Sequence, residues 1–221
     1  MYIKCASLIS WLSLYLLYCE LNIRLFVMYS SQIIEKDIIL SIYQNSRTVF
    51  RLNDIAMLTG ISNFQSLNKK LNYYVHSGKL LNPRKGIYAK PHYNYEELAC
   101  SVYPPVYISL EYVLQTSGIV FQYDSRITMV SYLSRNIEVD KQVYSYRRIK
   151  EIILINLEGI IRRDNVNIAT PERAFLDLLY LDKEYYFDNL NTIDERQVIK
   201  LLPLYQSKTL TQRATNLIGS D

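Results

Sequence analysis

The sequence predicts an α+β protein built in two parts, residues 28–92 and 93–221. Three observations support this prediction. Apolar residues recur at helical spacing between residues 31 and 77, two short β-prone segments flank a proline–glycine turn, and later stretches are rich in β-branched and aromatic side chains. We expect helices and a two-stranded hairpin in the first part, and a mixed domain with a small antiparallel sheet and C-terminal helices in the second.

The composition favours a folded protein and excludes several kinds of site. Hydrophobic residues make up 49% of the 221 residues and charged residues 21%, which favours a packed core over disorder. The chain has three cysteines, without a C-x-x-C pair, and two histidines. This disfavours a disulfide framework, a structural zinc site and histidine-based catalysis, and it suits a reducing cytoplasm. We therefore expect a cytoplasmic protein without a metal or other cofactor.

The first 27 residues are strongly apolar. The stretch is too short and too interrupted to predict a membrane-spanning helix, and no signal-peptide cleavage site follows it. We expect a soluble domain to begin at Met28, and we interpret residues 1–27 as a non-native or dispensable leader. The alternatives are a membrane or export segment and a genuine helix packed on the core, and we expect a membrane contact only if the leader is genuine.

The first part begins with two predicted helices. Residues 33–43 have apolar side chains at helical spacing and predict one helix, and residues 48–50 form a short β-prone run. A second, brief helix is expected to have Asn53 or Asp54 as its N-cap and to stop at Gly60.

The third predicted helix begins at Ser62, which is expected to form a capping box with Gln65, and it ends at Ser77. Its apolar residues form one stripe that faces the core. The opposite face, at about 100° per residue, combines polar, cationic and aromatic side chains. This helix is therefore expected to present a chemically distinctive outer surface.

A hairpin is predicted around residues 83–86, where Pro83 presets a turn and Gly86 supplies a positive φ. The order helix, strand, helix, helix and hairpin is typical of a winged helix-turn-helix. In such an arrangement the third helix enters the major groove of DNA and the hairpin contacts the neighbouring backbone. We therefore expect residues 28–92 to be a winged helix-turn-helix DNA-binding domain.

Positive charge is concentrated in this part. Residues 46–92 carry eight Lys or Arg side chains and one Asp, a net charge of +7, whereas the whole chain has a net charge of +4. Such a block indicates a polyanionic partner, which we expect to be double-stranded DNA, with a protein-docking winged helix as the alternative. Polar side chains near the start of the third helix would read bases, and cations at the hairpin tip would contact phosphates. The candidate DNA-binding residues are Asn63, Gln65, Ser66, Lys69, Lys70, Tyr73, Arg84 and Lys85.

The second part contains predicted helices and strands. Pro104 and Pro105 interrupt a helix that begins near residue 95, and Ser109 is expected to cap the next helix. Thr170 and Pro171 predict the start of another helix, and two further helices are expected to close the chain. Segments rich in β-branched and aromatic residues predict strands of an antiparallel meander over residues 127–133, 141–149 and 151–161.

The second part shows no recognisable catalytic set. It has no glycine-rich phosphate loop and no Ser-His-Asp or Cys-His combination. Glu138, Asp140 and Lys141 are close in sequence but lack the acid-x-Lys spacing of a metal-dependent nuclease, so we expect no enzymatic activity. The arginine pairs at 147–148 and 162–163 are compatible with a DNA path, a partner site or solvent-exposed strand ends.

Four motifs occur in order along the chain: "RKGIYAKP" running into "YNYEELA", then "YPPVYISLEYVLQTSGI", "IATPERAFLDLLYL" and "YYFDNLN". Together they resemble the AbiEi-like antitoxin family of AbiE-type bacterial toxin–antitoxin systems, over nearly all of the chain after Met28. The resemblance implies an N-terminal winged helix that binds and represses the system's own promoter. It also implies a C-terminal antitoxin domain that counteracts a nucleotidyltransferase-like toxin without a stable complex, as in type IV abortive-infection systems of phage defence.

The residues themselves leave two alternatives open. One is a winged-helix transcriptional regulator whose second domain senses a ligand, and the other is a nuclease-like second domain that the winged helix targets to DNA. The resemblance favours an antitoxin that is also a transcriptional autorepressor, and this is the function we expect.

Overall fold

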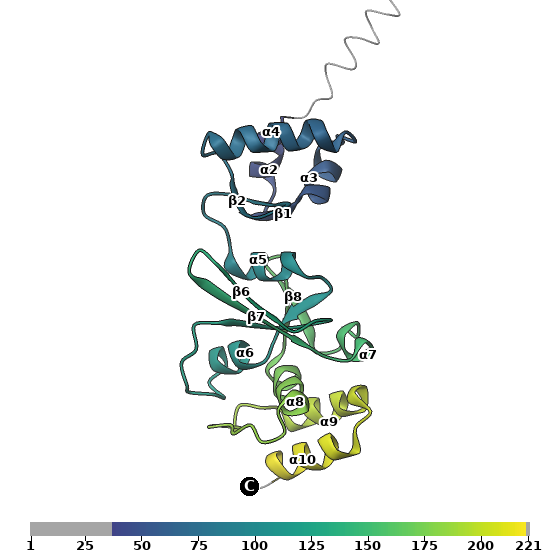
Figure 1. Cartoon of the computed structure of the whole chain (residues 1–221). Coiled ribbons are helices and arrows are strands. Elements are labelled where there is room, and N and C mark those ends of the chain that lie inside the picture. The colour runs from purple at the N-terminus through teal and green to yellow at the C-terminus, as the bar shows by residue number, and fades with distance from the viewer. Residues whose placement is uncertain (1–36, 220–221) are drawn as a thin grey trace, which may run out of the picture.

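The computed structural model describes residues 37–219 and shows an α+β protein with two sheets (Figure 1). The α+β class predicted from the sequence is therefore confirmed. The expected leader, residues 1–27, and the start of the first expected helix lie outside the described residues. Within residues 37–219, no helix is both long enough and apolar enough to cross a membrane.

Six elements form what we call the N-terminal unit. They are α2 (Ile38–Gln44), β1 (Val49–Arg51), α3 (Leu52–Thr59), α4 (Phe64–His76), β2 (Leu81–Arg84) and β3 (Ile87–Ala89). The strands form a sheet of order β1-β3-β2, in which β3 is antiparallel to both neighbours. Gly86 has a φ of 79° and closes the turn between β2 and β3, as expected, whereas Pro83 belongs to β2 and not to the turn.

Two helices of the N-terminal unit are capped by other residues than expected. Asn63, and not Ser62, is the N-cap of α4, and its Oδ1 accepts a hydrogen bond from the Ser66 amide at 3.0 Å. Asp54 lies inside the first turn of α3, where its carboxylate accepts a hydrogen bond from the Arg51 amide at 3.0 Å. Arg51 is the N-cap of α3, so the two helix starts differ from the expected ones by one to three residues, and both elements stay in place.

Strands β1 and β3 of this sheet are covered on both faces, because successive side chains of a strand point to opposite sides, whereas β2 is partly exposed. Phe50 and Tyr88 pack in a cluster with residues of α2, α3 and α4, whereas Val49 and Ile87 pack in the larger core of the second part. The sheet therefore lies between the helices of the N-terminal unit and α5 (Tyr95–Val102), as Figure 1 shows. The two parts of the chain pack directly on this shared sheet.

A six-stranded sheet forms the centre of the second part. Its strands are β4 (Val106–Ile108), β5 (Ile127–Ser131), β6 (Arg135–Val139), β7 (Gln142–Arg148), β8 (Ile160–Arg163) and β9 (Val166–Ala169). Their order is β6-β7-β5-β4-β9-β8, with β5 parallel to β7, β4 parallel to β9, and the other neighbours antiparallel. The predicted small antiparallel meander is therefore wrong, and the sheet is mixed.

Two hairpins account for this difference. Asp140 and Lys141 connect β6 to β7, and Asp164 and Asn165 connect β8 to β9; all four residues have positive φ, as two-residue hairpin turns of this type require. Because β6 folds back as the edge strand, β7 returns beside β5 and runs parallel to it. The segment expected to be a third strand begins instead with the short helix α7 (Glu151–Leu154), since periodicity does not separate helix from strand in so short an apolar run.

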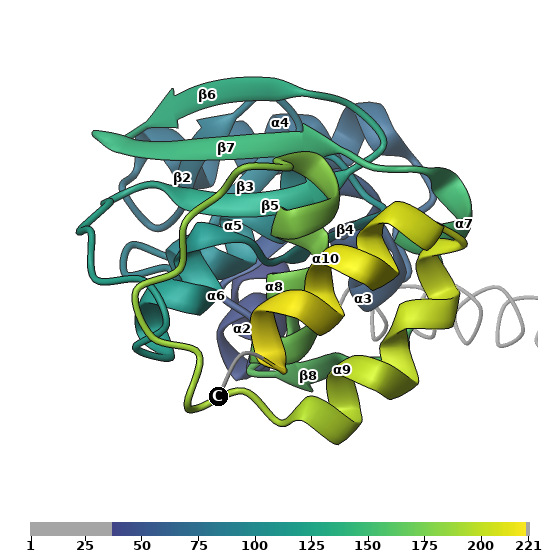
Figure 2. The ribbon, with the colours of Figure 1, turned by 90° about the horizontal axis from the view of Figure 1, so that it is seen from below.

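Helices cover both faces of this sheet (Figures 1 and 2). α5 packs on the face toward the N-terminal unit, and α6 and α8 pack on the other. Thr170 caps α8 as expected, but Leu110 precedes α6 in place of the expected cap Ser109, whose hydroxyl donates to Asp177 at 2.8 Å. The helices of this part beyond α5 and α7 are α6 (Glu111–Thr116), α8 (Pro171–Leu181), α9 (Glu195–Leu201), the 3-10 helix η1 (Leu202–Tyr205) and α10 (Lys208–Ile218).

A fully buried ion pair on α8 holds several of these elements together. Arg173 and Asp177 have no exposed surface, and Nε of the arginine lies 3.2 Å from Oδ1 of the aspartate. The guanidinium also donates to the carbonyls of Ile153 and Glu158, both at 2.8 Å, and Asp177 accepts a hydrogen bond from the Tyr205 hydroxyl at 2.7 Å. The pair therefore fixes α8 to the α7 segment and to η1.

Candidate nucleic-acid interface

α4 is the helix of the N-terminal unit that lies farthest from the second part, and its outer side faces solvent (Figure 1). Leu67 and Leu71 are fully buried on its inner side. Lys69 and Tyr73 lie about 120–160° around the helix from these leucines and are both exposed, Tyr73 by 64%. The inward leucines thus determine which side chains the helix presents to solvent.

Most of the predicted DNA-binding residues gather on or beside this helix. Asn63, Gln65, Lys69 and Tyr73 are exposed, and Ser66 and Lys70 are half-buried. The cap restricts Asn63, because its Oδ1 accepts the Ser66 amide and this bond fixes the side chain at the start of the helix, while its NH₂ group stays available to donate to a base. The structure therefore brings six of the predicted residues together.

Two further residues of α4 belong to the same outer surface. Asn72 and His76 are exposed, three and seven positions after Lys69. This spacing places both near Lys69 on the helix surface. Asn72 and His76 were not among the predicted site residues, although the helical period around Lys69 was sufficient to identify them.

Arg84 does not join this surface. Its guanidinium donates to the Tyr103 hydroxyl at 2.8 Å and lies 5.3 Å from the centroid of the same ring. Tyr103 follows α5 in the second part, and Arg135 of β6 donates to the same hydroxyl at 3.3 Å. Arg84 therefore joins the hairpin to the second part, whereas Lys85 is exposed at the turn.

The third helix and the hairpin tip, which were both expected to contact DNA, do not form one continuous cationic surface in the structure. α4 lies on the side of the N-terminal unit away from α5, whereas the β2–β3 hairpin lies on the side next to α5 (Figure 1). At its tip, the carbonyl of Gly86 accepts a hydrogen bond from the Leu52 amide at 3.0 Å, so the tip is held against the start of α3. Because Gly86 is bound to α3 and Arg84 is bound to Tyr103, the hairpin does not project as a free wing.

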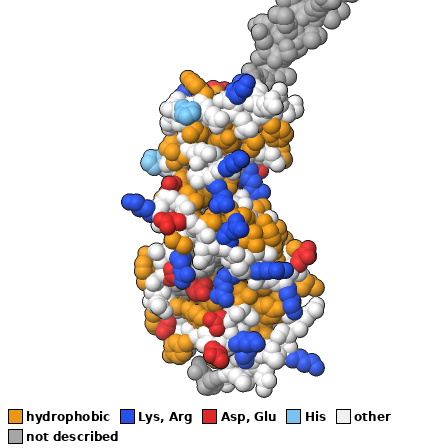
Figure 3. Space-filling model, viewed as in Figure 1, with side chains coloured by type: hydrophobic (Ala, Val, Ile, Leu, Met, Phe, Trp, Pro, Cys, Tyr) orange, Lys and Arg blue, Asp and Glu red, His pale blue; other side chains and the backbone are white. Residues whose placement is uncertain are grey.

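Much of the positive charge of residues 46–92 has partners inside the molecule. Arg47 pairs with Asp54 at 3.0 Å, Arg51 Nε donates to the Ser101 carbonyl at 2.8 Å, and Lys90 Nζ donates to the carbonyl of the α2 C-cap residue at 2.7 Å. Figure 3 shows Lys and Arg side chains gathered over the middle of the face in view, near the junction of the two parts. The charge block therefore indicates an interdomain junction as well as an outer surface.

In each arginine pair of the second part, one arginine makes an ion pair and the other is exposed to solvent. Arg147 lies 3.6 Å from Glu111, and Arg163 lies 3.7 Å from Glu96. The other member of each pair is exposed and has no acidic partner at ion-pair distance within residues 37–219. A continuous track of free arginines along the strands is not present in this part of the chain.

The acidic residues near the β6–β7 turn do not form a metal site among the described residues, and one of them makes a hydrogen bond within the protein. Asp140 accepts a hydrogen bond from the Tyr93 hydroxyl at 2.5 Å, and burial together with this bond raises the pKa of Tyr93. No group of three His, Cys, Asp or Glu side chains is placed to hold a metal ion in the described range. Burial raises the pKa of the Cys100 thiol to about 12, so this cysteine is protonated at neutral pH and is a poor nucleophile.

The comparison with solved structures finds distant likenesses. The chain matches no protein-family model and no curated protein. It is similar to the solved structure of the RV2827C protein from Mycobacterium tuberculosis, with a TM-score of 0.45 and 14% sequence identity over 83% of this chain and 75% of that chain. A likeness at this level supports no conclusion about function.

Proposed function

We propose that the N-terminal unit is a winged helix-turn-helix and that its α4 binds the major groove of duplex DNA. The order α2-β1-α3-α4-β2-β3 and the sheet order β1-β3-β2 support this assignment. The observation that carries it is the outer side of α4, where Lys69 and Tyr73 are exposed on a helix that stands clear of the second part. An exposed helix with cationic and amide side chains has the shape and chemistry that major-groove binding requires.

The proposal gives the α4 residues distinct roles. Lys69 and Lys70 contact phosphate or guanine, and Gln65 reads a base edge near the start of the helix. The hairpin has a different role from the usual DNA-contacting wing, because Arg84 is bound to Tyr103. In this account the hairpin fixes the orientation of α4 relative to the second part.

We further propose that the protein is the antitoxin and transcriptional autorepressor of an AbiE-type toxin–antitoxin system. This rests on the ordered motifs that resemble the AbiEi-like family, of which "RKGIYAKP" lies in the hairpin and "IATPERAFLDLLYL" covers β9 to α8. The DNA bound is then its own promoter, and the second part counteracts a nucleotidyltransferase-like toxin without a stable complex. Enzymatic activity and a bound cofactor are not part of this proposal.

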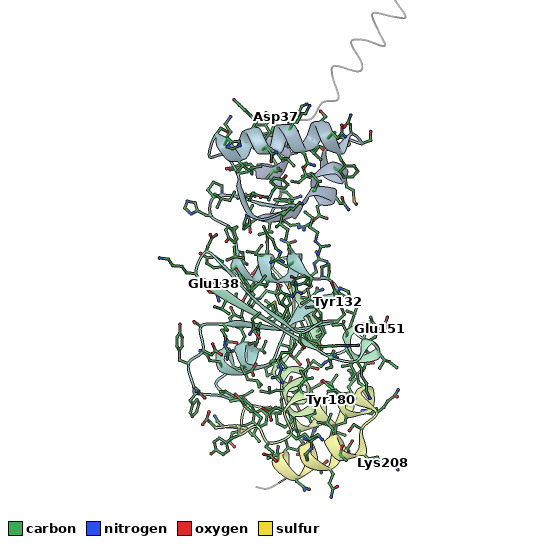
Figure 4. The ribbon with its side chains drawn as sticks, in the orientation of Figure 1. Asp37, Tyr132, Glu138, Glu151, Tyr180 and Lys208 are labelled. Carbon is green, nitrogen blue, oxygen red and sulfur yellow. The ribbon has the colours of Figure 1, made fainter. Side chains whose placement is uncertain are left out.

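The test is a gel-shift titration of the full chain with duplex DNA taken from upstream of its own gene. We expect Lys69→Glu to weaken binding by about 1–3 kcal/mol, since it replaces a phosphate or base contact with a repulsive charge. Lys208→Glu is the matched control, because Lys208 is exposed at the opposite end of the molecule (Figure 4). Equal affinities of the two variants would overturn the assignment of α4.

The antitoxin part of the proposal has a separate test in cells. The full chain is co-expressed with the product of the neighbouring gene, and growth is measured with and without it. We expect the full chain to restore growth, and we expect Lys69→Glu to restore growth equally when both genes are driven by an unrelated promoter. Failure of the wild-type chain to restore growth would contradict the antitoxin assignment without bearing on DNA binding.

A further inference from the structure

Two adjacent hollows run from the junction of the two parts toward α7, and we call them together the junction groove. One has a volume of about 380 Å³ and the other about 680 Å³, and Pro105, Leu154 and Ile155 line both. Arg51 of the N-terminal unit lines the first hollow, and Tyr132 lines the second. Figure 4 shows Tyr132, Glu151 and Tyr180, which line the second hollow, on the side of the second part that carries α7. The groove therefore receives residues from both parts.

The groove is bordered by large apolar side chains that are exposed to solvent. Leu157 is 71% exposed, Ile155 60% and Tyr132 48%, and all three line the groove. Ile152 is 52% exposed and lies one helical turn from Ile155. Scattered apolar residues are ordinary on a protein surface, but a contiguous patch along a groove marks a site of contact with another molecule.

The charged side chains of the groove are predominantly cationic. Arg162 lines the first hollow, and Arg148 and Lys150 line the second; all three are exposed and have no acidic partner at ion-pair distance in the described part of the chain. Glu97 also lines the first hollow, but its Oε2 already accepts three hydrogen bonds of 2.6–2.9 Å. The donors are the amide and the hydroxyl of Thr48 and the amide of Val49. Glu151 is the exposed carboxylate of the groove. Lys150 Nζ lies 5.9 Å from the centroid of the Tyr180 ring. The groove therefore combines exposed apolar side chains with cations that have no acidic partner among the described residues.

We propose that the junction groove binds an acidic, amphipathic segment of a partner protein. Apolar side chains of the segment would cover Ile155 and Leu157, and its carboxylates would pair with Arg162 at one end and with Arg148 and Lys150 at the other. The exposed aliphatic rim favours a polypeptide over a nucleic acid, which would bring phosphates to this apolar surface. It also favours a polypeptide over a small molecule, which would leave Leu157 and its neighbours in water.

The site is distinct from the outer side of α4, so its test does not depend on DNA binding. A displayed library of short random peptides is selected against the immobilised full chain, and the enriched peptides are synthesised with a fluorescent label. Their affinities are then measured by anisotropy for the wild type and for Leu157→Asp and Arg162→Glu. Both substitutions change exposed side chains, so the fold is expected to be retained.

We expect the enriched peptides to contain Asp or Glu beside Leu, Ile or Phe, and each substitution to weaken their binding about tenfold or more. Ile199→Asp and Arg196→Glu are matched controls on α9, where Ile199 is 53% exposed, and we expect neither to change the affinity. Enriched peptides without an acidic bias, or with equal affinity for all variants, would overturn the proposal.

Two other occupants of the groove have their own readouts. Sedimentation of the wild-type chain over a range of concentrations detects self-association, and a dimer that Leu157→Asp abolishes would assign the groove to a second copy of the chain. Titration with a labelled single-stranded oligonucleotide detects nucleic-acid binding. If Arg162→Glu lowers the affinity for the oligonucleotide and leaves the affinity for the peptides unchanged, the groove would be assigned to nucleic acid. Either result would overturn the proposal.

Discussion

We expect Arg173→Met to lower the free energy of unfolding strongly, because it leaves the buried carboxylate of Asp177 without its positive partner. Arg173 and Asp177 are both fully buried, and the guanidinium makes hydrogen bonds to Asp177, to the Tyr107 hydroxyl and to the carbonyls of Ile153 and Glu158. Met fills much of the same volume, so the cost comes mainly from the groups left unpaired. Removal of one member of a buried ion pair costs about 3–5 kcal/mol, and we expect a loss in this range.

A double-mutant cycle separates the pair from general damage to the core. Asp177→Asn alone leaves a buried guanidinium without its counter-charge, whereas the double variant Arg173→Met/Asp177→Asn leaves no unpaired charge. We therefore expect the double variant to lose about 1–3 kcal/mol less than the sum of the two single losses. Arg196→Met, at an exposed position of α9, is the matched control and should change the free energy of unfolding by less than about 0.5 kcal/mol.

The assay is urea unfolding followed by far-ultraviolet circular dichroism, with the slope of free energy against urea compared among variants. A constant slope shows that the midpoint shift measures stability. A loss below about 1 kcal/mol for Arg173→Met, or strictly additive losses in the cycle, would refute the assignment of this pair as the link between α8, the α7 segment and η1.

Three further predictions concern single positions. Asn63→Ala should cost about 1 kcal/mol in urea unfolding, because it removes the cap on the Ser66 amide, and Asn63→Asp should retain most of the stability; equal losses would contradict the cap. Gly159→Ala should cost at least about 1–2 kcal/mol, since Gly159 has a φ of 71° and a Cβ there would lie 2.9 Å from that of Arg173; an unchanged midpoint would contradict this. Cys100 should react with iodoacetamide at pH 8 at least about tenfold more slowly in the native protein than in urea, because a raised thiol pKa favours the unreactive protonated form; equal rates by peptide mass spectrometry would contradict it.

Local signals in the sequence predicted much of the N-terminal unit. The apolar stripe of α4, with Leu67 and Leu71 inward, follows from the helical period, and it placed Lys69 and Tyr73 on the outer side. Gly86 was recognised as a turn residue because its positive φ is a local requirement. These features depend on residues within one or two turns of each other, which is why the sequence was sufficient.

Features that depend on distant residues were not predicted. Nothing near Arg84 in sequence indicates that Tyr103 binds its side chain, so its charge was assigned to DNA. The parallel pairing of β5 with β7 likewise depends on where β6 folds back. The turn at Asp164 and Asn165 did carry a local signal, because both residue types tolerate positive φ, whereas Lys141 in the other turn gave no such signal.

The central claim is that the outer side of α4, and not the hairpin tip, contacts the DNA backbone. The most direct test is the salt dependence of affinity for the promoter duplex, measured by fluorescence anisotropy for the wild type, Lys69→Ala and Arg84→Ala. We predict that Lys69→Ala lowers the slope of log affinity against log salt by about 1, while Arg84→Ala leaves it unchanged because its guanidinium is bound to Tyr103. A slope reduced by Arg84→Ala but not by Lys69→Ala would contradict the account.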